Sequence, residues 1–280
     1  MNTEFYINSS YAISKLVTQK YSTSFSLATS LLRADQRRAV YAVYGFVRLA
    51  DEIVDSLHGY DKSFLLKKLY EDLNYALENG ISTNPIIVAF ASTVKKYDIH
   101  LDHIRAFMNS MEYDLSKTTY AKEEDLNQYI YGSADSVGLM CLQIFCHDHP
   151  SLYERLAFPA QKLGSAFQKV NFLRDLKDDL QGLGRSYFPE IIDSGLNQTN
   201  KKQIEQSIKK DFDDALVGVK QLPGRSKLAV ALAYYYYTGL LNKIVNTSPE
   251  KIMCQRMRIS NFRKYLIILK TMLLYKTKLI

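Results

Sequence analysis

Apolar residues recur at intervals of three and four positions along most of this 280-residue chain. That spacing gathers them on one face of a helix, whereas the two-residue alternation of strands, bounded by hairpin turns, is absent from the sequence. The pattern therefore predicts an all-α fold. The expected helices cover residues 22–33, 35–56, 61–79, 84–98, 100–114, 122–146, 150–182, 200–219, 225–246 and 260–277, with breaks at Gly59, Gly80, Pro85, Pro150, Pro189, Pro223 and Pro249.

The predicted helix near residues 35–56 has two unequal faces. Its apolar residues cover roughly half of the circumference on a helical wheel. A separate stripe of about 80° holds Tyr41, Tyr44, Arg48, Asp51 and Asp55. A solvated surface seldom mixes tyrosine, arginine and aspartate in this order. We interpret the stripe as one wall of a cavity, charged at one end and aromatic further along.

A second acidic row lies on the predicted helix 150–182, where Asn171, Asp175 and Asp179 are spaced i, i+4 and i+8 and Arg174 lies one step round. Positions four apart are about 40° apart on a helix, so such a row directs its oxygens to one side. Mg²⁺ takes oxygen ligands and often combines one or two carboxylates with substrate phosphates. The two acidic faces thus predict a diphosphate held through magnesium, and an exposed acidic surface is the alternative.

The acidic motifs contrast with the basic character of the whole chain. There are 36 Lys and Arg against 29 Asp and Glu, which gives a net charge of +7. No linker or low-complexity tract interrupts the sequence, and 47% of the residues are hydrophobic, so we expect one compact domain over residues 1–280. Nothing resembles a nucleic-acid-binding module. The positive charge is more simply explained by attraction for diphosphates and acidic lipid.

The three cysteines, Cys141, Cys146 and Cys254, form no paired framework and no zinc-like spacing, which predicts a reducing cytoplasm. The run Cys146 to His149 is a weak metal candidate, because adjacent residues on a helix point in different directions. Residues 1–10 contain no basic start followed by an apolar run, so we expect no signal peptide. No segment reaches the ~18 uninterrupted apolar residues of a membrane span.

The C-terminal helix, residues 262–279, mixes basic side chains with many large apolar ones. Two interpretations stay open. The helix can lie peripherally on an anionic membrane, at the inner membrane surface, or it can pack as a terminal helix with a solvated basic edge.

Five segments carry a resemblance to a known family. They are Tyr21-Ser22-Thr23-Ser24-Phe25-Ser26; Tyr41 to Asp55; Tyr129 to Gly138; Gln168 to Asp179 with Arg185, Tyr187 and Pro189; and Arg256-Met257-Arg258-Ile259-Ser260. In this order, over about residues 21–264, they resemble the squalene/phytoene synthases, which join two isoprenoid diphosphates head to head. The chain departs from the family where Tyr21 replaces a histidine of some members, Glu52 a common aspartate, and Asp135 a usual glycine.

The resemblance implies a single isoprenoid-synthase-type helical bundle around a central cavity. It implies Mg²⁺, with Mn²⁺ as an alternative, held by Asp51, Glu52, Asp55, Asn171, Asp175 and Asp179. It implies substrate binding by Tyr21, Ser22, Phe25, Tyr41, Tyr44, Arg48, Gln168, Arg174, Arg185, Tyr187 and Arg258, and it assigns catalytic roles to Tyr129, Arg48 and Arg174.

Aromatic residues at helical spacing are candidates for the wall of the cavity, where their faces would stabilise a carbocation. We expect Phe25, Tyr41, Tyr44, Tyr129 and Phe167 to line it. The run Tyr234 to Tyr237 covers a whole helical turn, so at most one or two of its rings can face the same cavity.

Within the family, Tyr41 to Asp55 and Gly164 to Pro189 most resemble bacterial phytoene synthases. That resemblance implies the condensation of two geranylgeranyl diphosphates, through a cyclopropyl diphosphate, to phytoene for carotenoid biosynthesis, with no nicotinamide cofactor. One alternative is a squalene or dehydrosqualene synthase that uses two farnesyl diphosphates. Another is a non-catalytic helical module that docks on membranes. The residue that would block the cavity floor, and with it the chain length, is not identifiable from the sequence, nor is the oligomeric state.

Overall fold

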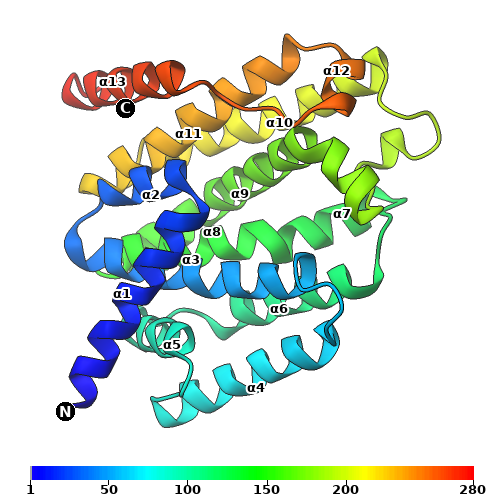
Figure 1. Ribbon diagram of the computed structural model, residues 1–280. Coiled ribbons are helices and arrows are strands. Elements are labelled where there is room, and N and C mark those ends of the chain that lie inside the picture. The colour runs from blue at the N-terminus through cyan, green and yellow to red at the C-terminus, as the bar shows by residue number, and fades with distance from the viewer. Residues whose placement is uncertain (1) are drawn as a thin grey trace.

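The chain is built from helices (Figure 1). The structure is a computed structural model that describes residues 2–280. Its α-helices are α1 (Thr3–Tyr21), α2 (Thr23–Ser30), α3 (Ala34–Asp55), α4 (Lys62–Asn79), α5 (Pro85–Tyr97), α6 (Leu101–Ser116), α7 (Glu123–Ile130), α8 (Ser136–Cys146), α9 (Pro150–Asp178), α10 (Gln198–Val219), α11 (Gly224–Val245), α12 (Pro249–Cys254) and α13 (Asn261–Lys276). Residues 2–280 contain no strand, only one parallel bridge between Thr119 and Ser186. The predicted all-α fold is confirmed.

Two apolar cores lie on either side of the middle of the molecule. One joins α3, α4, α5 and α6, and the other joins α7, α9, α10 and α11. In Figure 1 the first group fills the lower part of the view and the second the upper part, with α8 between them. Because α3 belongs to one group and α9 to the other, the two acidic motifs face each other across the boundary between the cores.

Local chemistry sets most of the helix ends near the predicted breaks. Asp61 accepts a hydrogen bond from the Phe64 amide and caps the start of α4, while Gly80 ends α4 in the left-handed conformation that glycine adopts most easily (φ 75°). Pro85 and Pro150 occupy the first turns of α5 and α9, where proline's missing N–H carries no penalty. Among residues 2–280, no helix is long and apolar enough to cross a membrane.

Helix α1 is absent from the sequence-based prediction, which begins its first helix at residue 22. The side of α1 that packs on α3 and α5 carries Ser10, Ser14 and Thr18, all fully buried. Each hydroxyl donates to the carbonyl four residues earlier, so none is left unpaired. Gly45 of α3 makes room for the contact, since a Cβ there would lie 3.2 Å from Ser14. Short helix α12 also lies outside the predicted set.

The expected helix 122–146 contains a π-helical segment, Tyr131–Asp135, between α7 and α8. This irregular turn presses Gly132 against α6: a Cβ at Gly132 would lie 2.5 Å from the Ala106 carbonyl oxygen and 2.8 Å from the Ser110 Cβ. Those distances are too short for any side chain, so the kink and the glycine depend on each other.

We expect Gly132→Ala to destabilise the protein by about 1–3 kcal/mol, because α6 backbone would have to move to admit the methyl group. Thermal denaturation should show a fall in Tm of roughly 3–10 °C. Gly182→Ala is the matched control, since Gly182 also lies in a π-helical segment, Asp179–Leu183, but a Cβ at this position would have no neighbour within 4 Å. Equal melting temperatures for the two variants would contradict the packing argument.

Candidate active site

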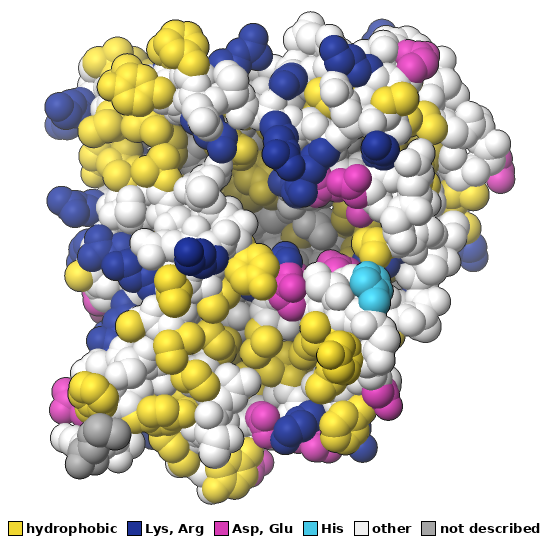
Figure 2. Space-filling view, viewed as in Figure 1, with side chains coloured by type: hydrophobic (Ala, Val, Ile, Leu, Met, Phe, Trp, Pro, Cys, Tyr) yellow, Lys and Arg dark blue, Asp and Glu magenta, His cyan; other side chains and the backbone are white. Residues whose placement is uncertain are grey.

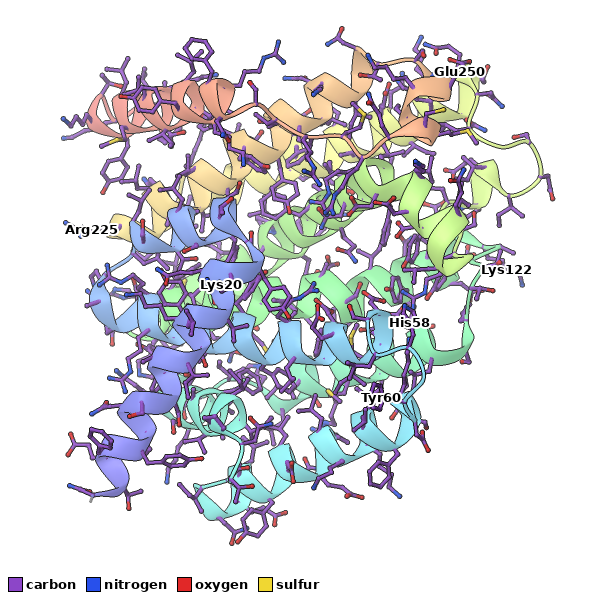
Figure 3. All side chains as sticks on the ribbon, viewed as in Figure 1. Lys20, His58, Tyr60, Lys122, Arg225 and Glu250 are labelled. Carbon is purple, nitrogen blue, oxygen red and sulfur yellow. The ribbon has the colours of Figure 1, made fainter. Side chains whose placement is uncertain are left out.

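The first acidic motif lies at the C-terminal end of α3, just before the loop that carries His58 and Tyr60 (Figure 3). The second lies at the end of α9 and in the π-helical segment that follows. Figure 2 shows a hollow in the middle of the visible face, with basic side chains above it and acidic side chains at its edge. The two rows predicted from sequence spacing are therefore brought to one region of the fold.

Arg185 links the two motifs. Its Nη1 donates to Asp55 Oδ1 at 2.8 Å, while its own backbone amide donates to the Asp179 carbonyl at 2.8 Å. Gly184 (φ 64°) turns the chain back at this point, and the bridge between Thr119 and Ser186 fixes the segment against the loop after α6. Arg185, with only 6% of its surface exposed, is thus built into the site rather than lying over it.

A buried carboxylate beneath Arg185 completes the link. Asp114 of α6 accepts hydrogen bonds from the Tyr129 hydroxyl at 2.9 and 3.0 Å, and its Oδ1 lies 3.7 Å from Arg185 Nη1. Arg185 Nη2 also donates to the Asp114 carbonyl at 2.8 Å. Tyr129 stacks in turn with Tyr187, and Tyr187 stacks on Phe172 at 3.9 Å between ring centroids. The hydroxyl of Tyr129 is therefore aimed at the acidic cluster.

Three carboxyl groups of the site resist ionisation. Burial, reinforced by neighbouring acid, raises the pKa of Asp51 and of Asp179 to about 7, and burial raises that of Asp114 to about 7 against the lowering effect of Arg185. Crowded carboxylates of this kind favour a nearby cation. Oxygen-only ligands of this type suit Mg²⁺ or Mn²⁺.

Arginines surround the acidic rows. Arg174 Nε donates to Asp175 Oδ1 at 3.0 Å, and Arg256 Nε pairs with the same oxygen at 2.8 Å. Arg48 forms an ion pair with Glu52 and lies over the Tyr21 ring, with 4.4 Å from Cζ to the ring centroid. Its Nε is buried and, within residues 2–280, has no hydrogen-bond partner. A buried cationic donor without a partner is what an anionic ligand needs.

Within residues 2–280, no three His, Cys, Asp or Glu side chains are close enough to hold a metal ion by themselves, and this includes the run Cys146 to His149. A cation between the two acidic rows would need further oxygen ligands. Phosphate oxygens of a substrate are ligands that Mg²⁺ prefers. The donor set therefore fits a metal that is shared with a diphosphate.

An apolar cavity begins at the second motif. Asn171, the first member of the row, lines the cavity and accepts a hydrogen bond from the Tyr237 hydroxyl at 3.2 Å. Along α9 the lining continues through Phe167 and Gly164 to Leu156. The other walls come from α2, α3, α8, α10 and α11, and they are almost entirely aliphatic or aromatic. A ligand with a charged head and a long apolar tail fits this arrangement.

The predicted aromatic lining is confirmed for three of five residues. Phe25 and Tyr44 line the cavity and stack at 4.8 Å, and Phe167 lines it and stacks on Tyr237 at 4.0 Å. The expectation that at most one or two rings of the run 234–237 face the cavity is also confirmed, since Tyr237 is the member of this run that lines it.

The predictions for Tyr41 and Tyr129 as lining residues are wrong. Tyr41 precedes Tyr44 by three positions, a rotation of about 60°, which is enough to turn its ring out of the cavity and into a second pocket. That pocket lies between α1 and α3 and includes Tyr11, Lys15 and Arg38. Tyr129 lies behind the cavity wall, in the aromatic stack beside Asp114.

Several predicted substrate-binding residues support the site indirectly. Ser22 caps α2 by accepting from the Phe25 amide at 3.2 Å, which holds Phe25 at the cavity. Gln168 Oε1 accepts a hydrogen bond from the side-chain Nδ2 of Asn171 at 3.4 Å. Arg258 has an exposed side chain, and the ion pair to Asp175 comes instead from Arg256, two residues earlier. Ligand contacts by Tyr21, Ser22, Gln168, Tyr187 and Arg258 stay predictions, as does metal binding by Glu52.

Sequence spacing does not identify two residues of the cluster. Asp114 lies outside every recognised motif, near the C-terminal end of an ordinary amphipathic helix, and nothing in its spacing distinguishes it. Arg256 belongs to the basic segment noted in the sequence, but spacing alone does not tell which of the two arginines on this extended segment pairs with Asp175. Both contacts depend on tertiary packing.

The unusual Asp135 is accommodated by two small residues of α9. Its carboxylate accepts from Ser165 Oγ at 2.9 and 3.0 Å, and a Cβ at Gly164 would lie 2.8 Å from Asp135 Oδ1. Burial raises the pKa of Asp135 to about 7. The carboxylate points away from the cavity, which the neighbouring Ser133, Ala134 and Val137 line.

Comparison with known proteins adds family and fold. The family model described as Squalene/phytoene synthase matches residues 18–263. Phytoene synthase 2 of Solanum lycopersicum is 30% identical over 249 residues, which cover 81% of this chain and 79% of that protein. Phytoene synthase 1 of Arabidopsis thaliana is 29% identical over 246 residues, covering 81% of this chain and 58% of the relative. The chain thus spans less than two thirds of that longer protein.

Solved structures show the same fold. A dehydrosqualene synthase has a TM-score of 0.82 at 23% identity, covering 97% of this chain and 98% of the other. A squalene synthase from Alicyclobacillus acidocaldarius has a TM-score of 0.75 at 21% identity, covering 88% and 96%. The predicted isoprenoid-synthase-type helical bundle is confirmed.

Proposed function

The chain belongs to the squalene/phytoene synthase family, whose members are prenyltransferases, and we propose that it joins two geranylgeranyl diphosphates head to head to form phytoene. The finding that carries the proposal is the junction at Asn171, where the row of oxygen ligands meets the apolar cavity. A prenyl diphosphate has the same two parts. Its diphosphate would lie between the acidic rows and its hydrocarbon chain in the cavity.

The length of the cavity supports a C20 substrate. Leu156 and Asn171 both line it and lie fifteen positions apart on α9, which corresponds to about 22 Å along the helix. An isoprene unit has four main-chain bonds against three in an amino-acid residue, so each unit extends by about 5 Å. A C20 chain of four units is therefore about 20 Å long and a C15 chain about 15 Å. The longer chain matches the lining better.

Magnesium would be held by Asp51, Asp55, Asn171, Asp175 and Asp179, with manganese as the alternative ion. When bound, it would neutralise the diphosphate and stabilise the charge that develops as the allylic carbon–oxygen bond breaks. Arg48 and Arg174, together with Arg256, can donate to the remaining phosphate oxygens. Glu52 holds Arg48 in place through their ion pair.

The aromatic pairs Phe25–Tyr44 and Phe167–Tyr237 border the cavity beside this charged end. Their ring faces would stabilise the allylic carbocation by about 1–2 kcal/mol, and the aliphatic walls exclude water that would otherwise capture it. The second prenyl double bond then attacks the cation, and loss of a proton closes the ring to give a cyclopropylcarbinyl diphosphate. A second ionisation, which releases the other diphosphate, followed by rearrangement and loss of a second proton, completes the hydrocarbon with no reductant consumed.

We further propose that residues 1–280 act as one domain, because helices from both cores line the same cavity. The cysteines Cys141, Cys146 and Cys254 are all free, which supports work in a reducing compartment such as the cytoplasm.

The decisive assay supplies the purified protein with magnesium and either geranylgeranyl or farnesyl diphosphate, without reductant, and identifies the hydrocarbon by mass spectrometry. We expect a C40 hydrocarbon with a central conjugated triene from the C20 substrate. A C30 product alone would replace the proposal with a dehydrosqualene synthase. A requirement for a nicotinamide cofactor would indicate a squalene synthase instead.

Ala160→Phe should shift the preference toward shorter chains. Ala160 lines the cavity one turn from Leu156, so a phenyl ring there would occupy the space needed by the last isoprene unit. We expect kcat/KM for the C20 substrate to fall by about 10- to 200-fold while that for the C15 substrate changes little. Ala157→Phe lies on the same helix but outside the cavity lining and serves as the control. Equal losses for both substrates would argue against a length-limiting role.

A further inference from the structure

Helix α13 has two apolar faces, and only one of them is covered. On the inner face, Ile267, Leu274 and Tyr275 pack against the core that contains α11, and Thr271 is fully buried. Gly239 of α11 allows this close approach, since a Cβ there would lie 3.2 Å from Ile267 Cδ1. The helix is therefore fixed to the body of the protein and does not need its other face for its own folding.

The outer face of α13, here called the outer stripe, consists of large apolar side chains in contact with solvent. They follow one another at steps of three, one, three, three and one, which keeps them on one side of the helix. The stripe consists of Phe262, Tyr265, Leu266, Leu269, Met272 and Leu273. Phe262 is 72% and Leu273 63% exposed. Hydrophobic side chains gather at the upper left of Figure 2, where Figure 1 places α13.

Basic residues border the outer stripe without acidic partners. They are Arg263, Lys270, Lys276 and Lys278, and within residues 2–280 none of them forms an ion pair. The sequence contains no Asp or Glu after Glu250. Continuous apolar surface bordered by unpaired positive charge is complementary to one kind of partner, an anionic lipid surface.

We propose that the outer stripe inserts into the headgroup region of an anionic bilayer while the bordering lysines and arginines contact lipid phosphates. A second copy of this chain is the other conceivable occupant. In a two-fold dimer the stripe would meet itself, so the basic borders of both copies would be brought together, which is unfavourable. A bilayer covers the apolar residues and neutralises the charges at the same time.

The docking face lies directly over the cavity wall. Helix α11, on which α13 packs, contributes Ala229, Val230, Ala233 and Tyr237 to the lining. If the proposed function holds, docking would leave only two helices, α13 and α11, between the apolar cavity and the membrane that receives its hydrocarbon product. The membrane contact itself does not depend on that function.

Vesicle flotation with the full-length protein tests the proposal. The probes are vesicles of phosphatidylcholine alone and vesicles in which one third of the lipid is phosphatidylglycerol. We expect binding to the anionic vesicles that weakens as salt is added. Phe262→Ser/Leu266→Ser/Leu273→Ser should lower the partition coefficient at least about 100-fold. Lys276→Glu/Lys278→Glu should lower it by at least about 25-fold on anionic vesicles only.

The matched control is Phe64→Ser/Tyr75→Ser/Val217→Ser, which removes equally exposed apolar side chains from other surfaces. It should bind vesicles like the unaltered protein, and thermal melts verify that every variant is folded. Unchanged binding by the outer-stripe variant overturns the proposal. So does an unaltered protein that ignores both vesicles but sediments as a dimer, if the outer-stripe variant is monomeric. Turnover of prenyl diphosphate in detergent is measured in parallel, so that failure of the proposed function is recognised separately.

Discussion

Asp175→Asn is expected to lower kcat/KM at least about a thousandfold, which corresponds to about 4 kcal/mol of lost transition-state stabilisation. The substitution keeps the size of the side chain and removes one charge from the centre of the row Asn171, Asp175 and Asp179. It also removes the partner that holds Arg174 and Arg256, at 3.0 and 2.8 Å, in position for a diphosphate. Both the metal and the arginines should therefore be affected together.

The measurement is magnesium-dependent release of diphosphate, followed across a range of magnesium concentrations. Asp51→Asn on the opposite wall should give a loss of the same order, because each row would hold its own share of the metal. A module without catalytic activity would release no diphosphate before or after either change. Full activity in both variants would disprove the assignment of the acidic rows.

Asp178→Asn provides the control on the same helix. Asp178 is adjacent to Asp179 and carries the same charge, but it points to solvent. Its substitution should leave kcat/KM within a few-fold of the unaltered protein. A large loss there would mean that general negative charge near the mouth, rather than the two directed rows, is what matters.

Spacing predicted the acidic site because its signal is local. Residues four apart on a helix share a face whatever the rest of the fold does, so the rows at 51/55 and 171/175/179 could be recognised from the sequence alone. A helical wheel is less accurate for residues at the edges of a helix face. Tyr41 and Tyr44 fall within one stripe of about 80°, yet the rotation of about 60° between them separates two pockets.

Helix α1 shows a different limit of prediction from the sequence. A hydrophobic pattern finds helices whose buried face is apolar, but α1 buries Ser10, Ser14 and Thr18 and exposes Phe5 and Leu16. Small hydroxyl side chains that bond to their own helix allow close packing without an apolar signal. Asp114 and Arg256 illustrate the same point for chemistry, since their roles arise from contacts across the fold that no spacing along the chain encodes.

The second large effect is expected at Arg185. Arg185→Gln should destabilise the protein by about 3–5 kcal/mol at pH 8, because it leaves the buried carboxylate of Asp114, and Asp55 beside it, without their cationic partner. It should also lower kcat/KM more than a hundredfold, since Arg185 fixes the segment after the second motif against α3. Chemical denaturation and the C20 assay measure the two effects separately.

The pH dependence identifies the electrostatic origin of this loss. Burial raises the pKa of Asp114 to about 7 in the folded protein, well above its ordinary value, so the folded state binds more protons than the unfolded state between about pH 4 and 7. Stability therefore falls as pH rises through that window. Arg185 lowers the pKa of Asp114, so its removal raises that pKa further and steepens the fall of stability with pH. The variant should be far closer to the unaltered protein at pH 5 than at pH 8, whereas a purely steric defect would be independent of pH.

A double-mutant cycle with Asp114→Asn then separates stability from catalysis. Removing the buried charge together with its partner should restore about 1–3 kcal/mol of the stability lost in Arg185→Gln. The reason is that the amide at position 114 leaves no unpaired charge in the core. Activity should stay low in the double variant, since Asp55 still lacks the hydrogen bond from Arg185, whereas the amide oxygen at position 114 can still accept a hydrogen bond from the Tyr129 hydroxyl. Recovery of both properties would mean that Arg185 acts only through folding. Recovery of stability alone assigns Arg185 the positioning of the acidic wall, which is the role that its contacts to both motifs indicate.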